Sequence, residues 1–522
     1  MNGAESLIRT LVEHRVDTCF MNPGTSEMHF VAALDDVTAM HGVLALFEGV
    51  ATGAADGYAR MALRPAATLL HLGPGLGNGL ANLHNARRAR SPIVNIVGDH
   101  AISHRPYDAQ LQSDIETVAR NVSAFVRSSE TASELGSDAI DALAAAKGPP
   151  GSVATLIVPA DVSWSEGGAV RSGPDPSRPL VGGTAPNEQA VELAASALRS
   201  EEPSVILIGG RACSEPILGL VADIAAGTGA KLLCETFPAR LERGAGRPPV
   251  ERLAYLAEFA AMQLDGTRHL ILVDAASPVS FFAYPGKQSD LVPNGCTVYP
   301  MAGASGDVRA SVAALASLLD VGARPAPLQQ ADSPSLPTGP LNAQAVCQAL
   351  GALMPEGAIV SDEGNTSGIW ASAATAGAPP HDWLCLTGGA IGQGLPVAVG
   401  AAIAAPGRPV LALESDGSAL YTLQSWWTMA REGLDVTTIL LNNHSYAVLN
   451  MELNRVGAES PGPRARDMLD LGRPSIDFVH LAKGLGLHAT RADTAESFSN
   501  ELAVALTTPG PSVVEAIIPS LL

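Results

Sequence analysis

Ser415-Asp416-Gly417-Ser418 and Leu441-Asn442-Asn443-His444-Ser445-Tyr446 each follow a short apolar run, and a helical pattern separates them. Asp416 and Asn443 are 27 positions apart. In a β-α-β unit this spacing places both side chains at the carboxyl ends of neighbouring parallel strands, where open α/β sheets bind ligands. Carboxylate and amide oxygens with a loop carbonyl suit Mg²⁺, which is usually shared with phosphates. The alternative to a metal site is that both pairs only form turns, because Asp-Gly and Asn-Asn are common turn pairs.

Composition narrows the class of protein. The chain has 522 residues, 47% of them apolar and 16% charged, so it can bury large cores and spans several domains. Its net charge of −20 argues against a nucleic-acid partner. No apolar run is long enough to span a bilayer, and no signal peptide is evident, so we expect a cytoplasmic protein without a membrane partner. The six scattered cysteines form no Cys-x-x-Cys motif.

Two stretches rich in Pro, Gly and Ser, at 165–187 and 322–341, are typical of linkers. They predict three domains, at 1–165, 183–322 and 341–522. Each domain alternates short apolar runs with helical patterns, which indicates parallel sheets. The runs are continuous rather than alternating, as in strands covered on both faces. The predicted fold is therefore α/β, with three doubly wound parallel-sheet domains in series.

The first domain offers three candidate residues at predicted strand ends. Thr25 lies in Asn22-Pro23-Gly24-Thr25-Ser26-Glu27, which is also a plausible helix cap. Glu48 ends an apolar run and opens a Gly/Ala-rich helix, where an acid also stabilises the helix dipole. His71 ends the run Ala66–Leu70 beside a Gly-rich stretch that we expect to be a loop, and is placed either for proton transfer or for a structural hydrogen bond.

Two other sites are weaker interpretations. The stretch after His71 contains Gly75-x-Gly77 but Leu80 stands where a dinucleotide fingerprint requires glycine, so an NAD-binding oxidoreductase is the less favoured class. The histidines at 84, 100 and 104 match no zinc spacing and are interpreted as structural or solvated.

Taken together, these motifs resemble the thiamine-diphosphate (ThDP) enzymes, in particular the benzoylformate decarboxylase and acetolactate synthase group. The resemblance covers nearly the whole chain, and its motifs occur in the family's order. They are Asn22-Pro23-Gly24, Leu44-Ala45-Leu46-x-Glu48, Ala54-Ala55-Asp56-Gly57-Tyr58-Ala59, the His71 strand end, Pro278-Val279, Gly388-Gly389-Ala390-Ile391-Gly392 with Leu395-Pro396, the Asp416 to Asn443 motif, and Ile476-Asp477-Phe478 with Leu481-Ala482-Lys483-Gly484.

The resemblance implies a role for each matching position. Glu48 is expected to hydrogen-bond N1′ of the aminopyrimidine, the Gly389 carbonyl to accept from the 4′-amino group, and Ile391 to hold the two rings bent. Asp416, Asn443 and the Ser445 carbonyl are expected to hold Mg²⁺ against the diphosphate. The expected diphosphate pocket adds Asn365, Thr366, Ser418 and Tyr446. Thr25 and His71 match positions that handle the substrate carboxylate and protons.

The implied reaction is decarboxylation of a 2-oxo acid, giving an aldehyde or, after attack on a second carbonyl, a 2-hydroxy ketone. Alternatives on the same scaffold are an acetolactate-synthase-like carboligase and a 2-hydroxyacyl lyase; a catalytically silent homologue is disfavoured because Glu48, Asp416 and Asn443 are all present. The family also implies a homodimer or homotetramer whose sites are shared between chains. The sequence does not support FAD.

The chain departs from this family at three places. Ser415 replaces the first Gly of the metal motif, so the turn must be made without it. The segment 278–284 lacks the second active-site His of benzoylformate decarboxylase. Asn450, Met451 and Glu452 stand where that relative has a more aromatic wall. Without that His, we expect slower protonation after decarboxylation, which favours carboligation.

Overall fold

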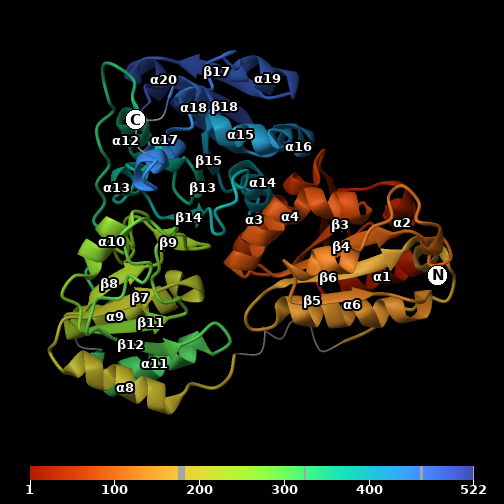
Figure 1. Cartoon of the computed structure of the whole chain (residues 1–522), viewed down its shortest axis with the longest axis horizontal. Helices are drawn as coiled ribbons and strands as arrows, with labels where there is room; N and C mark the ends of the chain where they lie inside the picture. Colours follow the sequence, from red (N-terminus) through yellow and green to blue (C-terminus); the bar gives the residue numbers. More distant parts are fainter. Residues whose placement is uncertain (174–182, 322–324, 459–461, 521–522) are drawn as a thin grey trace.

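The computed structural model describes residues 1–173, 183–321, 325–458 and 462–520. It forms three lobes, each built on its own sheet (Figure 1). Parts of both expected linkers, 174–182 and 322–324, lie outside the described residues. No helix in the described ranges is long and apolar enough to cross a membrane.

The first lobe carries a six-stranded parallel sheet in the order β2-β1-β3-β4-β6-β5. Its strands are β1 (Thr18–Asn22), β2 (His41–Leu44), β3 (Ala66–Leu70), β4 (Ile93–Asp99), β5 (Phe125–Ser128) and β6 (Val153–Pro159). Its helices are α1 (Gly3–Glu13), α2 (Met28–Ala33), α3 (Glu48–Ala62), α4 (Leu72–Ala89), α5 (Ile115–Arg120), α6 (Ala132–Lys147) and α7 (Ala160–Trp164).

The middle lobe has a five-stranded parallel sheet in the order β10-β8-β7-β11-β12. Its strands are β7 (Ser204–Ile208), β8 (Lys231–Cys234), β10 (Glu251–Arg252), β11 (His269–Val273) and β12 (Thr297–Ala302). The helices around it are α8 (Glu188–Arg199), α9 (Ile217–Thr228), α10 (Ala257–Leu264) and α11 (Val308–Leu319).

The third lobe has seven strands in the order β17-β18-β16-β15-β13-β14-β9. The strands are β9 (Leu241–Arg243), β13 (Ile359–Glu363), β14 (His381–Cys385), β15 (Val410–Ser415), β16 (Val436–Asn442), β17 (His488–Ala492) and β18 (Ser512–Ile517). The helices are α12 (Ala343–Leu353), α13 (Ala371–Ala374), α14 (Gly394–Ala404), α15 (Asp416–Thr422), α16 (Gln424–Glu432), α17 (Ala447–Arg455), α18 (Pro463–Asp467), α19 (Phe478–Gly484) and α20 (Ala495–Thr507).

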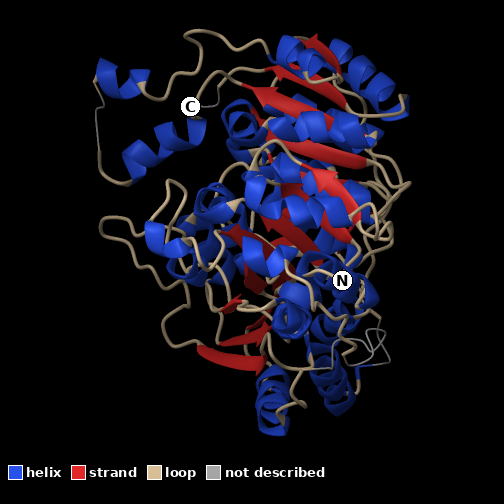
Figure 2. Cartoon of the chain, turned by 90° about the vertical axis from the view of Figure 1, so that its right-hand side faces the viewer, coloured by secondary structure: helices blue, strands red, loops and turns tan. Residues whose placement is uncertain are grey.

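The predicted fold class, three parallel-sheet α/β domains, is confirmed, with one unexpected exchange. β9 comes from the middle segment of the sequence but pairs antiparallel with β14 at the edge of the third sheet. The inner strands β4, β6 and β16 are buried along their whole length, as their continuous apolar runs predict. Helices cover both sides of the strands (Figure 2).

The Gly-rich stretch after β3 is helical, which corrects the expectation of a loop there. α4 begins at Leu72 and includes Gly75 and Gly77. Pro74 lies in the first helical turn, where its missing N–H is not needed. A Cβ at Gly79 would lie 2.9 Å from Thr52 Cγ2, so the glycine permits close packing of α4 on α3.

The first and third lobes share one apolar core within a single chain. Buried residues of α3, such as Val50 and Ala54, belong to the same cluster as Leu395 and Val397 of α14. A Cβ at Gly400 would lie 1.8 Å from the Ala54 carbonyl oxygen, so the helices touch through their backbones. Two domains that are far apart in the sequence therefore pack directly against each other within one chain.

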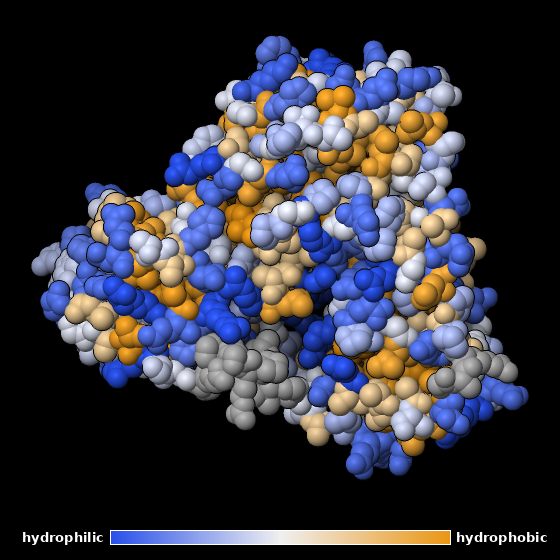
Figure 3. All heavy atoms as spheres, turned by 180° about the vertical axis from the view of Figure 1, so that it is seen from behind, coloured by the Kyte–Doolittle hydropathy of each residue, from blue (hydrophilic) through white to orange (hydrophobic). Residues whose placement is uncertain are grey.

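The outer surface carries both hydrophobic and hydrophilic residues (Figure 3). Seen from behind, hydrophobic residues form several separate patches among hydrophilic ones (Figure 3).

Candidate active site

Asp416 and Asn443 lie where their spacing predicted. β15 and β16 are parallel neighbours with Ser415 opposite Leu441, so Asp416 and Asn443 follow the carboxyl ends of adjacent strands. Asp416 Oδ1 accepts from the Gly417 N–H at 2.8 Å, whereas the buried Oδ2 has no hydrogen-bond partner among the described residues. Burial raises the pKa of Asp416, although the amides of Gly417, His444 and Asn443 oppose the shift. An unpaired buried carboxylate oxygen is costly unless a cation or donor meets it. This oxygen therefore fits a hard divalent cation.

Asn443 and Ser445 lie in the loop that follows β16. Asn443 Oδ1 accepts from the Ser445 N–H at 3.0 Å. The intervening His444 has a φ of +54°, which reverses the chain within the loop. The Ser445 backbone and the Asn443 side chain are thus held together beside Asp416.

Ser415 replaces a glycine at no conformational cost. Its φ of −100° and ψ of 154° are extended values that any residue adopts. Its hydroxyl donates to the Glu363 carbonyl oxygen at 3.2 Å, which fastens the end of β15 to β13. The departure from the family motif therefore adds a contact and leaves the turn intact.

The expected diphosphate residues surround the same corner. Asn365 Nδ2 donates to Ser418 Oγ at 2.9 Å, and Thr366 follows in the same short turn, half-buried. A Cβ at Gly417 would lie 2.4 Å from Tyr446 Cε1, so the Tyr446 ring lies directly over this glycine. The structure brings all four residues to one end of β13, β15 and β16.

Gly389 and Ile391 lie in the loop between β14 and α14. Gly389 has a φ of +73°, and a Cβ there would lie 2.6 Å from Phe281 Cζ. Phe281 in turn packs against Tyr255, with ring centroids 5.3 Å apart. The segment without the second histidine therefore presents an aromatic ring to the Gly389 backbone. Tyr255 Oη donates to Glu452 of α17 at 3.3 Å, so the two departures from the family adjoin each other.

Two buried glutamates below this loop were not identified from the sequence. Glu363 accepts from the Gly392 N–H at 2.7 Å and the Gly394 N–H at 2.6 Å. Burial raises the pKa of Glu363 to about 7. Burial, and then the charge of Glu363, raise the pKa of Glu414 well above its usual range. The sequence feature that could have identified them is an acidic residue at the end of each of two apolar strands.

This acid pair predicts a stability that falls as pH rises. In the unfolded chain both carboxyls ionise near about pH 4.3. Because the folded-state pKa values are higher, folding favours the protonated forms, and stability falls from that pH through about 7. We expect the thermal unfolding midpoint of the metal-free protein to fall between about pH 5 and about pH 8, and Glu414→Gln to lessen that fall. Exposed Glu356→Gln is the control; an equal slope in all three proteins would contradict the prediction.

The first-domain residues form a second corner. His71 Nδ1 lies 2.8 Å from Glu27 Oε2, which also accepts from the Gly24 N–H at 2.7 Å. Glu27 is 3% exposed, and its Oε1 has no hydrogen-bond partner in the described part of the chain. Burial raises the pKa of Glu27, against the Gly24 amide and His71. The sequence motif predicts only a helix cap around Glu27; the cap exists, and the same carboxylate orients His71. Thr25 lies two residues before Glu27 and is exposed.

Glu48 is the first residue of α3 and is 7% exposed. Its Oε2 accepts from Asn78 Nδ2 at 3.0 Å. A Cβ at Gly75 would lie 3.3 Å from its Oε1, so α4 passes close to the carboxylate. Asn78 was not identified from the sequence, because only the folded α4 reveals its contact.

Two family models match the chain. The family described as thiamine pyrophosphate enzyme, N-terminal TPP binding domain, matches residues 1–119, and the corresponding C-terminal TPP binding domain matches residues 362–516. A Mycobacterium tuberculosis protein with the provisional name acetolactate synthase large subunit IlvX is 58% identical over 100% of both chains. Benzoylformate decarboxylase of Pseudomonas aeruginosa is 29% identical over 97% of this chain and 96% of its own.

Solved structures agree on the fold. The ThDP-dependent 4-hydroxybenzoylformate decarboxylase of Rhodococcus jostii superposes with a TM-score of 0.85, at 23% identity, over 99% of both chains. Benzoylformate decarboxylase of Polynucleobacter necessarius gives a TM-score of 0.80, at 20% identity, over 100% of this chain and 99% of its own.

Proposed function

Because this chain belongs to the thiamine pyrophosphate enzyme family, we propose that it uses ThDP and Mg²⁺ to decarboxylate a 2-oxo acid. The observation that supports Mg²⁺ binding is the buried Asp416 Oδ2 at the end of β15, which lacks a hydrogen-bond partner among the described residues. When bound, ThDP supplies a nucleophilic carbon and accepts the electron pair released with CO₂. The protein's own residues bind, orient and move protons around it.

The third lobe would hold the charged end of the cofactor. Asp416, the Asn443 amide oxygen and the Ser445 carbonyl would coordinate Mg²⁺, an oxygen-only set that suits this cation. Asn365, Thr366, Ser418 and Tyr446 would line the diphosphate pocket. Gly389 would offer its carbonyl to the 4′-amino group, and Ile391 would support the bend between the rings.

The first lobe would handle protons. Glu48 would hold a proton at N1′ of the pyrimidine, favoured by its place at the start of α3. His71, fixed by Glu27, would exchange protons with the substrate end of the site. Thr25 would hydrogen-bond the substrate carboxylate.

A carboligase is the second candidate on the same scaffold. Phe281 rather than a histidine faces Gly389, so 278–284 brings no proton donor of that kind. Slower protonation after loss of CO₂ leaves time for attack on a second carbonyl. The provisional acetolactate synthase name of the M. tuberculosis relative agrees with this alternative. A 2-hydroxyacyl lyase would use the same bond cleavage on a different substrate.

A substrate panel tests the proposal. Purified protein with ThDP and Mg²⁺ would be offered 2-oxo acids with small, branched and aromatic side chains, and both CO₂ and carbon products would be identified. We expect CO₂ release from at least one acid; aldehyde identifies a decarboxylase, and 2-hydroxy ketone a carboligase. Aldehyde formed from a 2-hydroxyacyl thioester without CO₂ would identify a lyase. Binding of NAD but not ThDP by calorimetry would overturn the proposal.

We also propose that the active unit is at least a dimer with shared sites. The support is the resemblance to ThDP enzymes, which implies that the Glu48 carboxylate of one chain serves the third lobe of another. A second chain would bring its third lobe to that carboxylate.

A further inference from the structure

The loop that carries Gly389 and Ile391 lacks the regular backbone hydrogen bonds of a helix or a strand. Gly389 and Gly392 both have left-handed backbone angles, with φ of +73° and +96°. The segment therefore forms neither helix nor strand between β14 and α14. Buried peptide groups in such a segment need partners from elsewhere.

Asn85 of α4 supplies partners for both backbone groups of one residue of this loop. Its Nδ2 donates to the Ala390 carbonyl oxygen at 2.8 Å, and its Oδ1 accepts from the Ala390 N–H at 3.1 Å. Asn85 is completely buried. Ala390 lies between Gly389 and Ile391, so the amide of Asn85 grips the segment at its midpoint.

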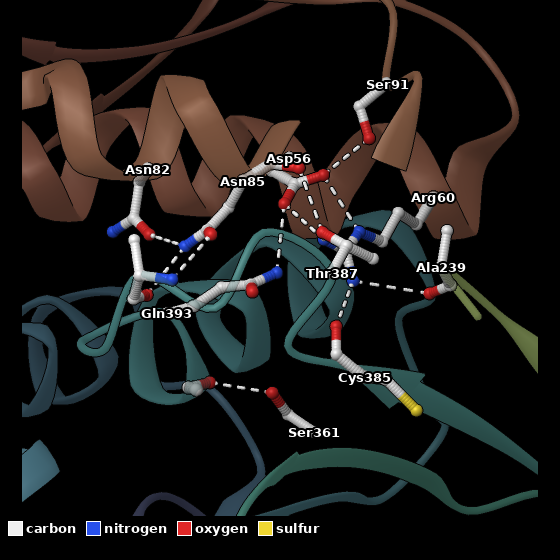
Figure 4. A network of polar contacts seen from close by, with 12 residues as sticks. Asp56, Arg60, Asn82, Asn85, Ser91, Ala239, Ser361, Cys385, Thr387 and Gln393 are labelled. Atoms are coloured by element: carbon white, nitrogen blue, oxygen red, sulfur yellow. Dashed lines mark hydrogen bonds and ion pairs between the residues drawn. The ribbon is translucent and has the colours of Figure 1, made fainter. Parts of the chain in front are cut away.

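Asn82, one turn earlier on α4, holds a second carbonyl of the loop. Its Nδ2 donates to the Gly392 carbonyl oxygen at 3.0 Å and to the Gly49 carbonyl oxygen at 2.8 Å. Its Oδ1 accepts from Asn85 Nδ2 at 2.9 Å, which joins the two amides (Figure 4). The loop is thereby tied to the residue that follows Glu48.

The same face of α4 also reaches the Glu48 carboxylate. Asn78, Asn82 and Asn85 are spaced as i, i+4 and i+7, so they lie on one side of the helix. A helix rises about 1.5 Å per residue and is stiff over such a length. α4 therefore fixes the position of the loop relative to α3 of the same chain.

The network is reinforced beyond the asparagines. His84 Nε2 lies 3.1 Å from the Gly388 carbonyl oxygen. The buried Asp56–Arg60 ion pair of α3 reaches Gln393 and Thr387 of the loop and the Cys385 carbonyl at the end of β14 (Figure 4). Since the third lobe fastens the other side through Glu363, the loop is clamped between two lobes.

We propose that Asn82 and Asn85 are positioning residues, which hold the Gly389–Ile391 backbone in the geometry that activates the cofactor. The inference rests on the proposed function and extends it to two residues of α4. An amide is required at position 85 because Ala390 needs a donor and an acceptor at once. A carboxylate of the same shape accepts from the N–H but repels the carbonyl oxygen.

The test compares Asn85→Asp with Asn95→Asp. Asn95 is as buried as Asn85 and is hydrogen-bonded within the first sheet to Thr68 and Thr155, away from the loop. With Mg²⁺ present, calorimetry measures the Kd for ThDP, and acid-quenched NMR measures proton exchange at C2 of bound ThDP. Thermal unfolding with and without cofactor reports stability.

We expect Asn85→Asp to slow exchange at saturating ThDP by roughly 10- to 100-fold, the scale of a small misplacement in an active site. Asn95→Asp should lose stability but exchange at the wild-type rate. Wild-type exchange in Asn85→Asp, or equal slowing in Asn95→Asp, would overturn the inference. If Asn85→Asp does not fold, Asn82→Ala is expected to show the same slowing, and a wild-type rate there would overturn it equally. Wild type that binds no ThDP would refute the proposed function instead.

Discussion

Asp416→Ala is expected to abolish retention of ThDP in the presence of Mg²⁺. The substitution removes the carboxylate whose Oδ2 lacks a partner at the end of β15, so the cation loses its charged ligand. Mutation of a residue that only orients a metal ligand lowers metal affinity by about 10- to 100-fold. We therefore expect removal of the ligand itself to lower the affinity by more than about 100-fold. Calorimetric titration with ThDP and Mg²⁺ measures the loss.

Asp435→Ala is the matched control for that experiment. Asp435 precedes β16, at the end of the sheet opposite to Asn443. Its variant should bind ThDP as wild type does. Tight ThDP binding by Asp416→Ala would show that the cation is held elsewhere.

Glu48→Gln is expected to leave ThDP bound but to slow C2 proton exchange by about 10²-fold or more, the usual contribution of a positioned acid or base. A neutral amide cannot stabilise a proton at N1′. The competing interpretation is that Glu48 only stabilises the amino terminus of α3, a term of about 0.3–1 kcal/mol.

Glu134→Gln separates the two interpretations of Glu48. Glu134 also lies in the first turn of a helix, α6. Its substitution should lower stability without changing the rate of proton exchange at C2 of ThDP. A Glu48→Gln protein that exchanges at the wild-type rate would leave only the helix-dipole role.

The two inactive variants together test whether sites are shared. If Glu48 of one chain serves Asp416 of another, co-refolded mixtures of Glu48→Gln and Asp416→Ala regain one intact site per mixed dimer. Mixtures that stay inactive, with a monomeric mass of active wild type in light scattering, would place each site within one chain. The direct packing of α3 on α14 makes that outcome physically possible.

Local patterns predicted the sheet residues well. The run Ala66–Leu70 is β3 with those bounds, because a fully buried parallel strand is continuously apolar. The spacing of Asp416 and Asn443 predicted their shared edge for the same reason: one crossover returns the chain to the neighbouring strand. The Gly-rich start of α4 was missed because glycine has low helix propensity, and tight packing against α3 overrides it.

The sequence by itself determined the family, the three parallel sheets and the residues at their carboxyl ends, since these depend on contiguous apolar runs and short motifs. Only the tertiary structure decided which side chains from distant segments meet. The contacts of Glu27 with His71, of Asn78 with Glu48, and of Asn82 and Asn85 with the Gly389 loop join segments up to 310 positions apart. Such pairs leave no periodic trace in one sequence, because hydrogen bonds depend on distances that packing alone sets.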